Sequence, residues 1–309
     1  MSLEIPALGS HRCSSYGNGF FTIVVDGYVN FLHCIVPLFS AASDQYVWRG
    51  MRDPSWNLVS TLARELEKMP IRINNDHRNH WKIEATKITI DQLTGYLEQL
   101  RGLGGLDDSS GELHERLLAE KKMNHHSFLE VIRKLEKFRF KIYELFATGQ
   151  HHDLLTPFMD WTTNPFAALF FAFYRSDSRA DGDGDRVVYA LNRTQIEEDF
   201  PARDIESVIF TESMAYDNPR IIGQSGLFTF TPTHEPLDRW VVKQYAPKPK
   251  LKPILIRFLI QNKSRSECLR KLEMIGIHNR SIFPDRHGAA QEANSKTIHN
   301  ISKIKLTIP

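Results

Sequence analysis

The chain has 309 residues and a formal net charge of +2, with 41% hydrophobic and 25% charged residues. This composition is typical of a globular protein with a large core, arranged as one large domain or two ordinary ones. A net charge this close to zero excludes a general attraction to nucleic acid or to membranes, so any such contact needs a local patch. The three cysteines are far apart and include no CxxC pair, which argues against a disulfide framework and a cysteine zinc site and favours the reducing cytoplasm.

The apolar stretch over residues 20–42 is interrupted by Asp26, Asn30 and His33, and we interpret it as a β-hairpin rather than a membrane span. Asp26-Gly27 predicts the two-residue turn between the runs FFTIVV and YVNFLHCIV. The first residues also lack the basic start and the cleavage site of a signal peptide. We therefore expect a cytoplasmic protein that does not enter the membrane, with residues 1–45 as an N-terminal β-hairpin extension.

Helical spacing of apolar residues dominates the next part of the chain. After the β-prone run YVWRGMRD, Asp53-Pro54 predicts an N-cap followed by proline in the first turn. Three helices are expected from the periodicity, over residues 54–69, 90–101 and 126–146. The turn-rich sequence RGLGGLDDSSGE, residues 101–112, predicts a mobile loop.

From residue 164 onwards the pattern changes. Asn164-Pro165 begins a helix through Tyr174 that is apolar on every face and is expected to be buried. After a turn-rich loop over 179–185 come short β-branched and aromatic runs, RVVYALN, ESVIF, GLFTFTP and PILIRFLI. A last helix, 265–275, ends before Gly276. The predicted fold class is α+β, with a helical N-terminal half packed on a mixed or antiparallel sheet that forms the second half.

Arg49-Gly50 is the first candidate site. The planar guanidinium of arginine suits a phosphate, and glycine lets a ligand approach the backbone closely. The alternative is an arginine at a strand end that forms a surface ion pair.

The densest polar cluster, QHHDLLTPFMDWTT, precedes the apolar helix. One of His151 and His152 can line a cleft as a donor or acceptor, but the His-His pair has no third ligand at helical spacing, and no metal is expected. Asp160, flanked by Met159 and Trp161, is expected to be shielded from water. If it is buried, its carboxylate must be hydrogen-bonded to a backbone donor or paired, for example with Arg49. Thr162 or Thr163 is expected to cap the helix, whose N-terminus also attracts anions.

Two later segments carry weaker signals. Gln224 lies between two glycines before a β run, which predicts either an ordinary turn or an amide beside a ligand. The run KQYAPKPKLKPILIR, residues 243–257, carries five cations. It predicts an extended solvated connector or phosphate contacts to RNA or DNA.

Four motifs resemble the FRG domain, a bacterial domain named for an aromatic-Arg-Gly triplet. They are WRG at 48–50, QHHDLLTPFMDWTTNPFAALFFAF at 150–173, NPRIIGQSGLF at 218–228 and GIHNRSIFPD at 276–285. The resemblance implies an FRG domain over 46–290, with a helical insertion at about 70–146 and a C-terminal tail at 291–309. This chain departs from the family pattern by having Trp48 for phenylalanine, Asp153 for glycine, Leu155 for proline and Pro157 for arginine.

FRG-domain proteins in turn resemble ADP-ribosyltransferases, which implies an ADP-ribosyltransferase-like fold and NAD as the substrate. In those enzymes a first-strand Arg-Gly holds NAD, and a second-strand element leads into a helix under the nicotinamide pocket. The implied NAD-binding residues are Arg49, Gly50, Trp161, Thr162 and Thr163. The third element, a late-strand glutamate, has no clean counterpart here, and Gln224, Glu212 and Glu235 are the substitutes.

The resemblance implies an enzyme that cleaves NAD and transfers ADP-ribose to a macromolecule, as a toxin or phage-defence effector with an antitoxin or other regulator protein. The implied catalytic residues are Arg49, His151, Asp160 and Gln224. RNA or DNA is preferred over protein as the acceptor because of the basic run 243–257. The alternatives are a non-catalytic nucleotide- or protein-binding module, and a nuclease-like toxin in which Asp160 orients His151 as the base.

Overall fold

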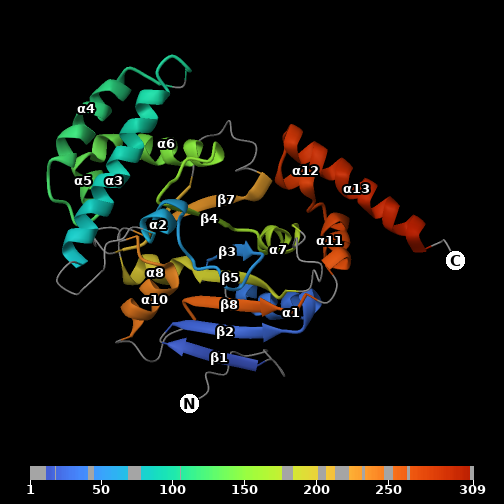
Figure 1. Cartoon of the computed structure of the whole chain (residues 1–309). Coiled ribbons are helices and arrows are strands. Elements are labelled where there is room, and N and C mark those ends of the chain that lie inside the picture. Colours follow the sequence, from blue (N-terminus) through green and yellow to red (C-terminus); the bar gives the residue numbers. More distant parts are fainter. Residues whose placement is uncertain are drawn as a thin grey trace.

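The computed structural model describes residues 12–17, 19–40, 45–68, 78–104, 106–175, 184–200, 207–212, 223–231, 234–246, 253–262 and 265–306. Within these ranges eight strands form one mixed sheet (Figure 1). In chain order they are β1 (Arg12–Gly17), β2 (Phe20–Val25), β3 (Tyr46–Met51), β4 (Phe158–Thr162), β5 (Arg186–Asn192), β6 (Ile209–Thr211), β7 (Gly226–Phe230) and β8 (Leu255–Ile260).

The strands lie in the order β1-β2-β8-β5-β3-β4-β7-β6. The pair β2–β8 is parallel, and the other neighbouring pairs are antiparallel. The α+β class and the mixed sheet are thus confirmed. The expectation that the second half alone forms the sheet is wrong, because β1 to β3 come from the first 51 residues.

Helices cover both faces of the sheet. One face packs against α8 (Arg193–Asp199) and α10 (Leu237–Tyr245). The other face packs against α1 (Gly27–Ser40), α7 (Pro165–Phe173), α11 (Arg265–Met274) and α12 (Asn279–Ile282). Beside them, β4 and β7 share a separate core cluster with α3 (Arg78–Gln99), α4 (Ser109–Lys121), α5 (Phe128–Lys134) and α6 (Arg139–His151). The short α2 (Thr61–Leu66) and the long C-terminal α13 (Arg286–Leu306) complete the described helices, none of which is long and apolar enough to cross a membrane.

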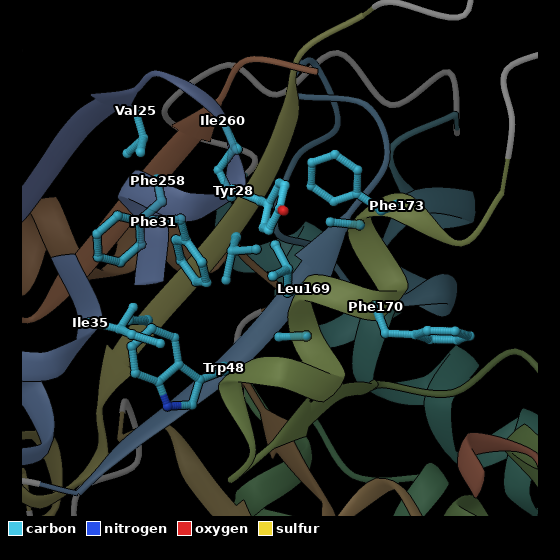
Figure 2. Packing of buried hydrophobic residues seen from close by; sticks show 14 of the residues in the cluster. Val25, Tyr28, Phe31, Ile35, Trp48, Leu169, Phe170, Phe173, Phe258 and Ile260 are labelled. Carbon is cyan, nitrogen blue, oxygen red and sulfur yellow. The ribbon is translucent and has the colours of Figure 1, made fainter. Parts of the chain in front are cut away.

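The apolar helix α7 is buried as the sequence predicted. Figure 2 shows Leu169, Phe170 and Phe173 of α7 in one cluster with Trp48 of β3 and Phe258 of β8. The helix begins cleanly because Asn164 caps it and Pro165 occupies its first turn. Its burial holds the strand that carries Arg49 against the centre of the molecule.

The predicted hairpin around Asp26-Gly27 is wrong. The residues after Gly27 form helix α1, because Tyr28, Phe31, Cys34 and Ile35 recur at helical spacing and all four are buried. The hairpin lies one strand earlier, between β1 and β2. Because β2 also pairs with β8, the sheet continues across the expected boundary at residue 45.

The expected helices exist, but several of their limits differ. Asp53 accepts hydrogen bonds from the main chain and side chain of Ser55, which forms a local turn, and the helix starts only after its cap Ser60. Helix α3 starts twelve residues before its predicted start, at Arg78. The helix expected over 126–146 is broken between α5 and α6 by a 3-10 turn, Glu136–Phe138. The loop expected over 101–112 gives way to α4 at Ser109.

The strand runs and the last helix are confirmed more closely. The run RVVYALN is β5 over its whole length, and α11 ends shortly before Gly276, whose φ of +83° suits glycine. Several expectations lie wholly or partly outside the described residues, namely the loop at 179–183, the motif part 218–222, residues 247–252 of the basic run, and 307–309 of the tail.

A buried polar contact joins α3 to the segment between β7 and α10. Oγ1 of Thr89 in α3 lies 3.2 Å from Nε2 of His234, and both residues are buried. The ring of Trp81 packs edge-on against the imidazole at 6.4 Å. Burial lowers the pKa of His234 to about 4.

Gly50 is expected to tolerate no side chain, because a Cβ there would lie 1.7 Å from the main-chain oxygen of Ala168 in α7. Gly50→Ala should lower the free energy of unfolding by about 1–3 kcal/mol, the range for an overpacked core. Gly111→Ala is the control, since an added Cβ meets no atom within 4 Å in α4. It should be neutral or stabilising by up to about 1 kcal/mol. Equal denaturation midpoints for the two variants would contradict this packing.

His234 should make the fold sensitive to acid. Its pKa of about 4 in the folded chain is below the ordinary value of 6.5 in the unfolded chain, so the unfolded chain takes up the proton first. The stability that depends on neutral His234 is therefore complete above pH 6.5 and is lost as the pH falls towards 4. Denaturant titrations should show a shallower pH dependence for His234→Asn than for the wild-type chain in this window. Parallel curves would rule this out.

Candidate functional site

A cavity of about 320 Å³ opens on the face of the sheet that carries α7. It is lined by residues of β3, β4, α6 and α7, by Gln224 before β7, and by Phe283 after α12. Its volume is at the lower end of the range for small-molecule sites. Segments from four distant parts of the sequence therefore meet around one space.

Arg49 joins β3 and β4 at the cavity. The two strands share a single residue pair, Trp48 with Thr162. Next to this pair, Nη1 of Arg49 donates to the main-chain oxygen of Asp160 at 2.5 Å and lies 3.7 Å from its carboxylate oxygen Oδ2. The guanidinium thus satisfies a carbonyl that the diverging strand does not reach. The predicted pairing of Arg49 with Asp160 is confirmed.

The expected burial of Asp160 is wrong, because its side chain is 59% exposed. Side chains alternate along a strand, and Met159 and Trp161 enter the core on the opposite face of the sheet. Asp160 therefore points to the cavity side. The apolar neighbours in the sequence are not its neighbours in space.

The Arg49 side chain is 22% exposed. Partial burial lowers the pKa of its guanidinium, whereas the charge of Asp160 raises it. Arginine keeps its proton at neutral pH in either case. The buried Nε has no hydrogen-bond partner within the described part of the chain. Arg49 thus brings a positive charge to the cavity wall.

Gln150 holds the carboxylate from the other side. Its Nε2 donates to Oδ1 of Asp160 at 2.5 Å, and its Oε1 accepts from Oγ1 of Thr156 at 2.6 Å. Thr156 is fully buried, and its main-chain oxygen accepts from Leu62 of α2. Both carboxylate oxygens of Asp160 therefore face donors, on Arg49 and Gln150. The buried Thr156 holds Gln150 in place, and this fixes the orientation of the carboxylate.

Thr162 links β4 to the segment before β7. Its Oγ1 donates to the main-chain oxygen of Gln224 at 2.6 Å and accepts from the main chain of Asn164 at 3.0 Å. The expectation that Thr162 or Thr163 caps α7 is wrong, because β4 extends through Thr162 and the cap is Asn164. Thr163 is exposed, and its main-chain N–H donates to Ser225.

Trp161 and Gly50 lie at the cavity wall but have structural roles. The indole of Trp161 is 3% exposed, and its Nε1 donates to Oγ1 of Thr229 in β7 at 2.9 Å. The missing side chain of Gly50 makes room for the backbone of α7. Both positions are explained by packing, and their contact with NAD stays a prediction.

Gln224 positions α12 at the cavity. Its Nε2 donates to the main-chain oxygen of Ile282 at 3.2 Å. A Cβ on the neighbouring Gly223 would lie 2.5 Å from the main-chain oxygen of Ser281, so the two segments pack backbone to backbone. This contact brings Phe283 to the cavity wall.

The expected glutamate substitutes are not at the site. Glu212 pairs with Arg193 at 2.8 Å, and Glu235 lies 4.0 Å from Lys243. Neither is among the cavity-lining residues, whose acids within the described ranges are Asp153 and Asp160. The acids found at the cavity wall therefore come from the segment 153–160.

His151 is the last residue of α6 and lines the same cavity. Arg49, His151, Asp160 and Thr162 thus converge as expected, although their chemical roles stay predictions. The orientation of His151 by Asp160 also stays a prediction, since the contacts found for that carboxylate are to Arg49 and Gln150. Across the described residues, no group of three or more His, Cys, Asp or Glu side chains could hold a metal ion.

Sequence reasoning missed three contributors, Gln150, Thr156 and Phe283. Gln150 and Thr156 stand in the same motif as His151. Two hydrogen-bonding side chains on either side of a turn were the feature of the sequence that could have indicated their contact. Phe283 stands in the motif GIHNRSIFPD, but only the three-dimensional contact of α12 with Gln224 places it at the cavity.

Comparison with family models matches the FRG domain to residues 44–181. The chain therefore contains an FRG domain, and the matched range runs from the start of β3 past the end of α7. The search of curated proteins and the search of solved structures each found no match.

Asp153 stands where the FRG pattern usually has glycine, and its φ is +62°. Because glycine adopts this left-handed conformation without strain, Asp153→Gly should leave the melting temperature unchanged or raise it. Asp153→Val should lower the stability by about 1–2 kcal/mol, since a β-branched side chain is strained there. Thermal melts of both variants check this. A Val variant as stable as the Gly variant would contradict it.

Proposed function

We propose that this FRG-domain protein binds NAD in the cavity and transfers ADP-ribose to a macromolecule, as an ADP-ribosyltransferase-like toxin or defence effector. One observation carries the proposal. Arg49, Thr162 and Gln224 come from β3, from β4 and from the segment before β7, and these three strands are neighbours. Helix α7 follows β4 directly and packs behind the site, the layout that the resemblance to ADP-ribosyltransferases requires.

Binding would rest on Arg49 and Thr162. The Arg49 guanidinium offers positive charge and a planar donor set to the diphosphate of NAD. The Thr162 hydroxyl, at the end of β4, would contact the nicotinamide ribose. A cavity of about 320 Å³ suits one nucleotide half of NAD, so the adenosine half would extend through the opening.

Asp160 would serve as the catalytic carboxylate. The bond between the ribose C1′ and the nicotinamide nitrogen breaks, and nicotinamide leaves with the bonding electrons. Positive charge develops on the ribose, and a fixed carboxylate stabilises it. The acceptor atom then forms a bond to C1′ and gives up its proton, for which His151 is the candidate base. Gln150 keeps the carboxylate aimed during both steps.

A non-catalytic binding module is the second candidate. It is favoured by the absence of a glutamate from the described cavity wall and by the bond of the Gln224 amide to Ile282. A nuclease-like toxin is the third, supported by the presence of His151 and Asp160 in the same cavity. These alternatives predict no nicotinamide release.

Incubation with NAD should therefore release nicotinamide, measured by chromatography, in the presence of total RNA, DNA or protein as acceptor. Asp160→Asn should reduce the rate by about 100-fold or more, the effect of removing one charge-stabilising group. Its melting temperature should change little, because the side chain is 59% exposed.

The matched control is Asp108→Asn, an exposed aspartate at the start of α4, far along the chain from the cavity segments. Nicotinamide release by the control should equal that of wild type. Full activity of Asp160→Asn would refute the assignment of Asp160 as the catalytic carboxylate. If the wild-type protein does not turn over NAD, the transferase is refuted and a non-catalytic binding module becomes the favoured function.

A further inference from the structure

An edge of aromatic side chains leads from the cavity to the protein surface. Phe171 of α7 and Phe283 both line the cavity, and their rings meet edge to face at 6.0 Å. Phe283 also contacts Tyr174 at 5.7 Å and His287 at 6.0 Å. The rings of Phe171, Tyr174 and Phe283 are partly exposed and that of His287 is exposed. We call these four residues the aromatic edge.

Three arginines lie around this edge. Arg175 places its guanidinium over the ring of Tyr174 at 5.3 Å. Arg280 and Arg286 stand three residues before and after Phe283, and both line an open hollow of about 640 Å³ next to it. All three side chains are exposed, and none has an acidic partner within the described ranges.

The acids of that hollow are already engaged. Oε1 of Glu292 lies 3.4 Å from Nζ of Lys296, and its Oε2 lies 3.5 Å from Nδ1 of His278. Oδ1 of Asp285 accepts from the main chain of Gly288 at 2.9 Å. The positive charge of Arg280 and Arg286 is therefore left to act on a ligand.

The α3–α6 group differs in this respect. Five cations of this group pair with carboxylates at 2.5–3.3 Å, in Arg116–Glu112, Lys121–Asp91, Lys134–Glu120, Lys137–Glu112 and Arg139–Glu136. Arg175, Arg280 and Arg286 differ from these paired cations, and they lie beside the cavity.

The basic run 243–257, which suggested nucleic acid from the sequence, does not reach the cavity in its described part. Lys243 belongs to α10, on the opposite face of the sheet from α7. Arg257 lies in β8 and donates to the main-chain oxygen of Pro54. Figure 1 shows α10 to the left of the central strands and α12 to their right, next to α13. The described part of the basic run therefore does not support a nucleic-acid acceptor at the cavity. The aromatic edge and its arginines are the surface that does.

We propose that the acceptor is a single-stranded nucleic acid that crosses the aromatic edge, with a base stacked on Phe283 and phosphates on Arg175, Arg280 and Arg286. Aromatic side chains with interspersed cations are the usual means of binding single strands, because every base offers a ring face and every nucleotide a phosphate. A duplex fits poorly, since its bases are stacked on one another. The proposal names the acceptor of the proposed transferase and so rests on that function.

The test is fluorescence anisotropy with labelled twelve-nucleotide single strands, as RNA and as DNA of the same sequence, in the absence of NAD. The variant Arg280→Ala/Arg286→Ala is compared with Arg116→Ala/Arg139→Ala, which removes the same charge from paired positions. A single-strand phosphate contact contributes about 0.7 to the slope of log K against log salt, so losing two lowers the slope by about 1.4. The control should keep the wild-type slope.

Phe283→Leu should weaken binding by roughly tenfold with an unchanged salt slope, because a stacked base is lost without a phosphate contact. A thermal melt shows whether this variant is folded, and the arginine pair tests the proposal independently. The RNA and DNA arms decide which sugar is preferred.

Equal affinities and slopes for the two arginine pairs would overturn the proposal, as would ADP-ribose transfer to protein alone. Arg49→Ala separates the two levels, since it should lose NAD turnover and keep nucleic-acid binding. If the wild-type protein binds nucleic acid with the expected salt slopes but does not turn over NAD, the proposed transferase function is refuted. The aromatic edge would then still be a binding surface for single-stranded nucleic acid.

Discussion

The hydrogen bond from Arg49 to the main-chain oxygen of Asp160 is the contact on which the site depends. It joins β3 and β4 at the point where they stop pairing. The space between the two strands there is part of the cavity. A strand carbonyl needs a donor, and here a side chain supplies it instead of a neighbouring strand. The same guanidinium leaves positive charge at the cavity and fixes one side of the Asp160 carboxylate.

The apolar helix α7 explains why a polar cluster can lie beside the most hydrophobic segment of the chain. Its side chains fill the core against Trp48 and Phe258, and its backbone presses on Gly50. Burial of this helix fixes β3, and its cap at Asn164 fixes the end of β4. The polar groups of the site are therefore oriented by hydrophobic packing behind them, which limits their motion without adding polar groups to the core.

Strong local patterns made part of this structure predictable. The all-apolar run of α7 is compatible only with a buried helix, and the β-branched run of β5 only with a buried strand. Both elements were predicted from the sequence and are present in the structure. The run after Gly27 is compatible with both a strand and a helix because it is short and apolar, and only its packing on β8 decides between them. Helix α4 was missed because a glycine-rich turn precedes it.

The site was predictable in its members more than in its contacts. Arg49 and Asp160 could be paired because opposite charges near apolar segments need each other, but the exposure of Asp160 depends on the side of β4 on which it lies. The contacts of Gln150 with Asp160 and of Gln224 with Ile282 depend on how α6 and α12 dock, information that no local pattern holds.

The central claim is that this cavity binds NAD through Arg49, and calorimetric titration of NAD into the wild-type chain and Arg49→Ala tests it most directly. We predict one site per chain in wild type and a loss of affinity of at least tenfold in the variant, whose melting temperature should be measured alongside. Equal affinities of the two proteins, or no heat of binding with folded wild type, would contradict the account.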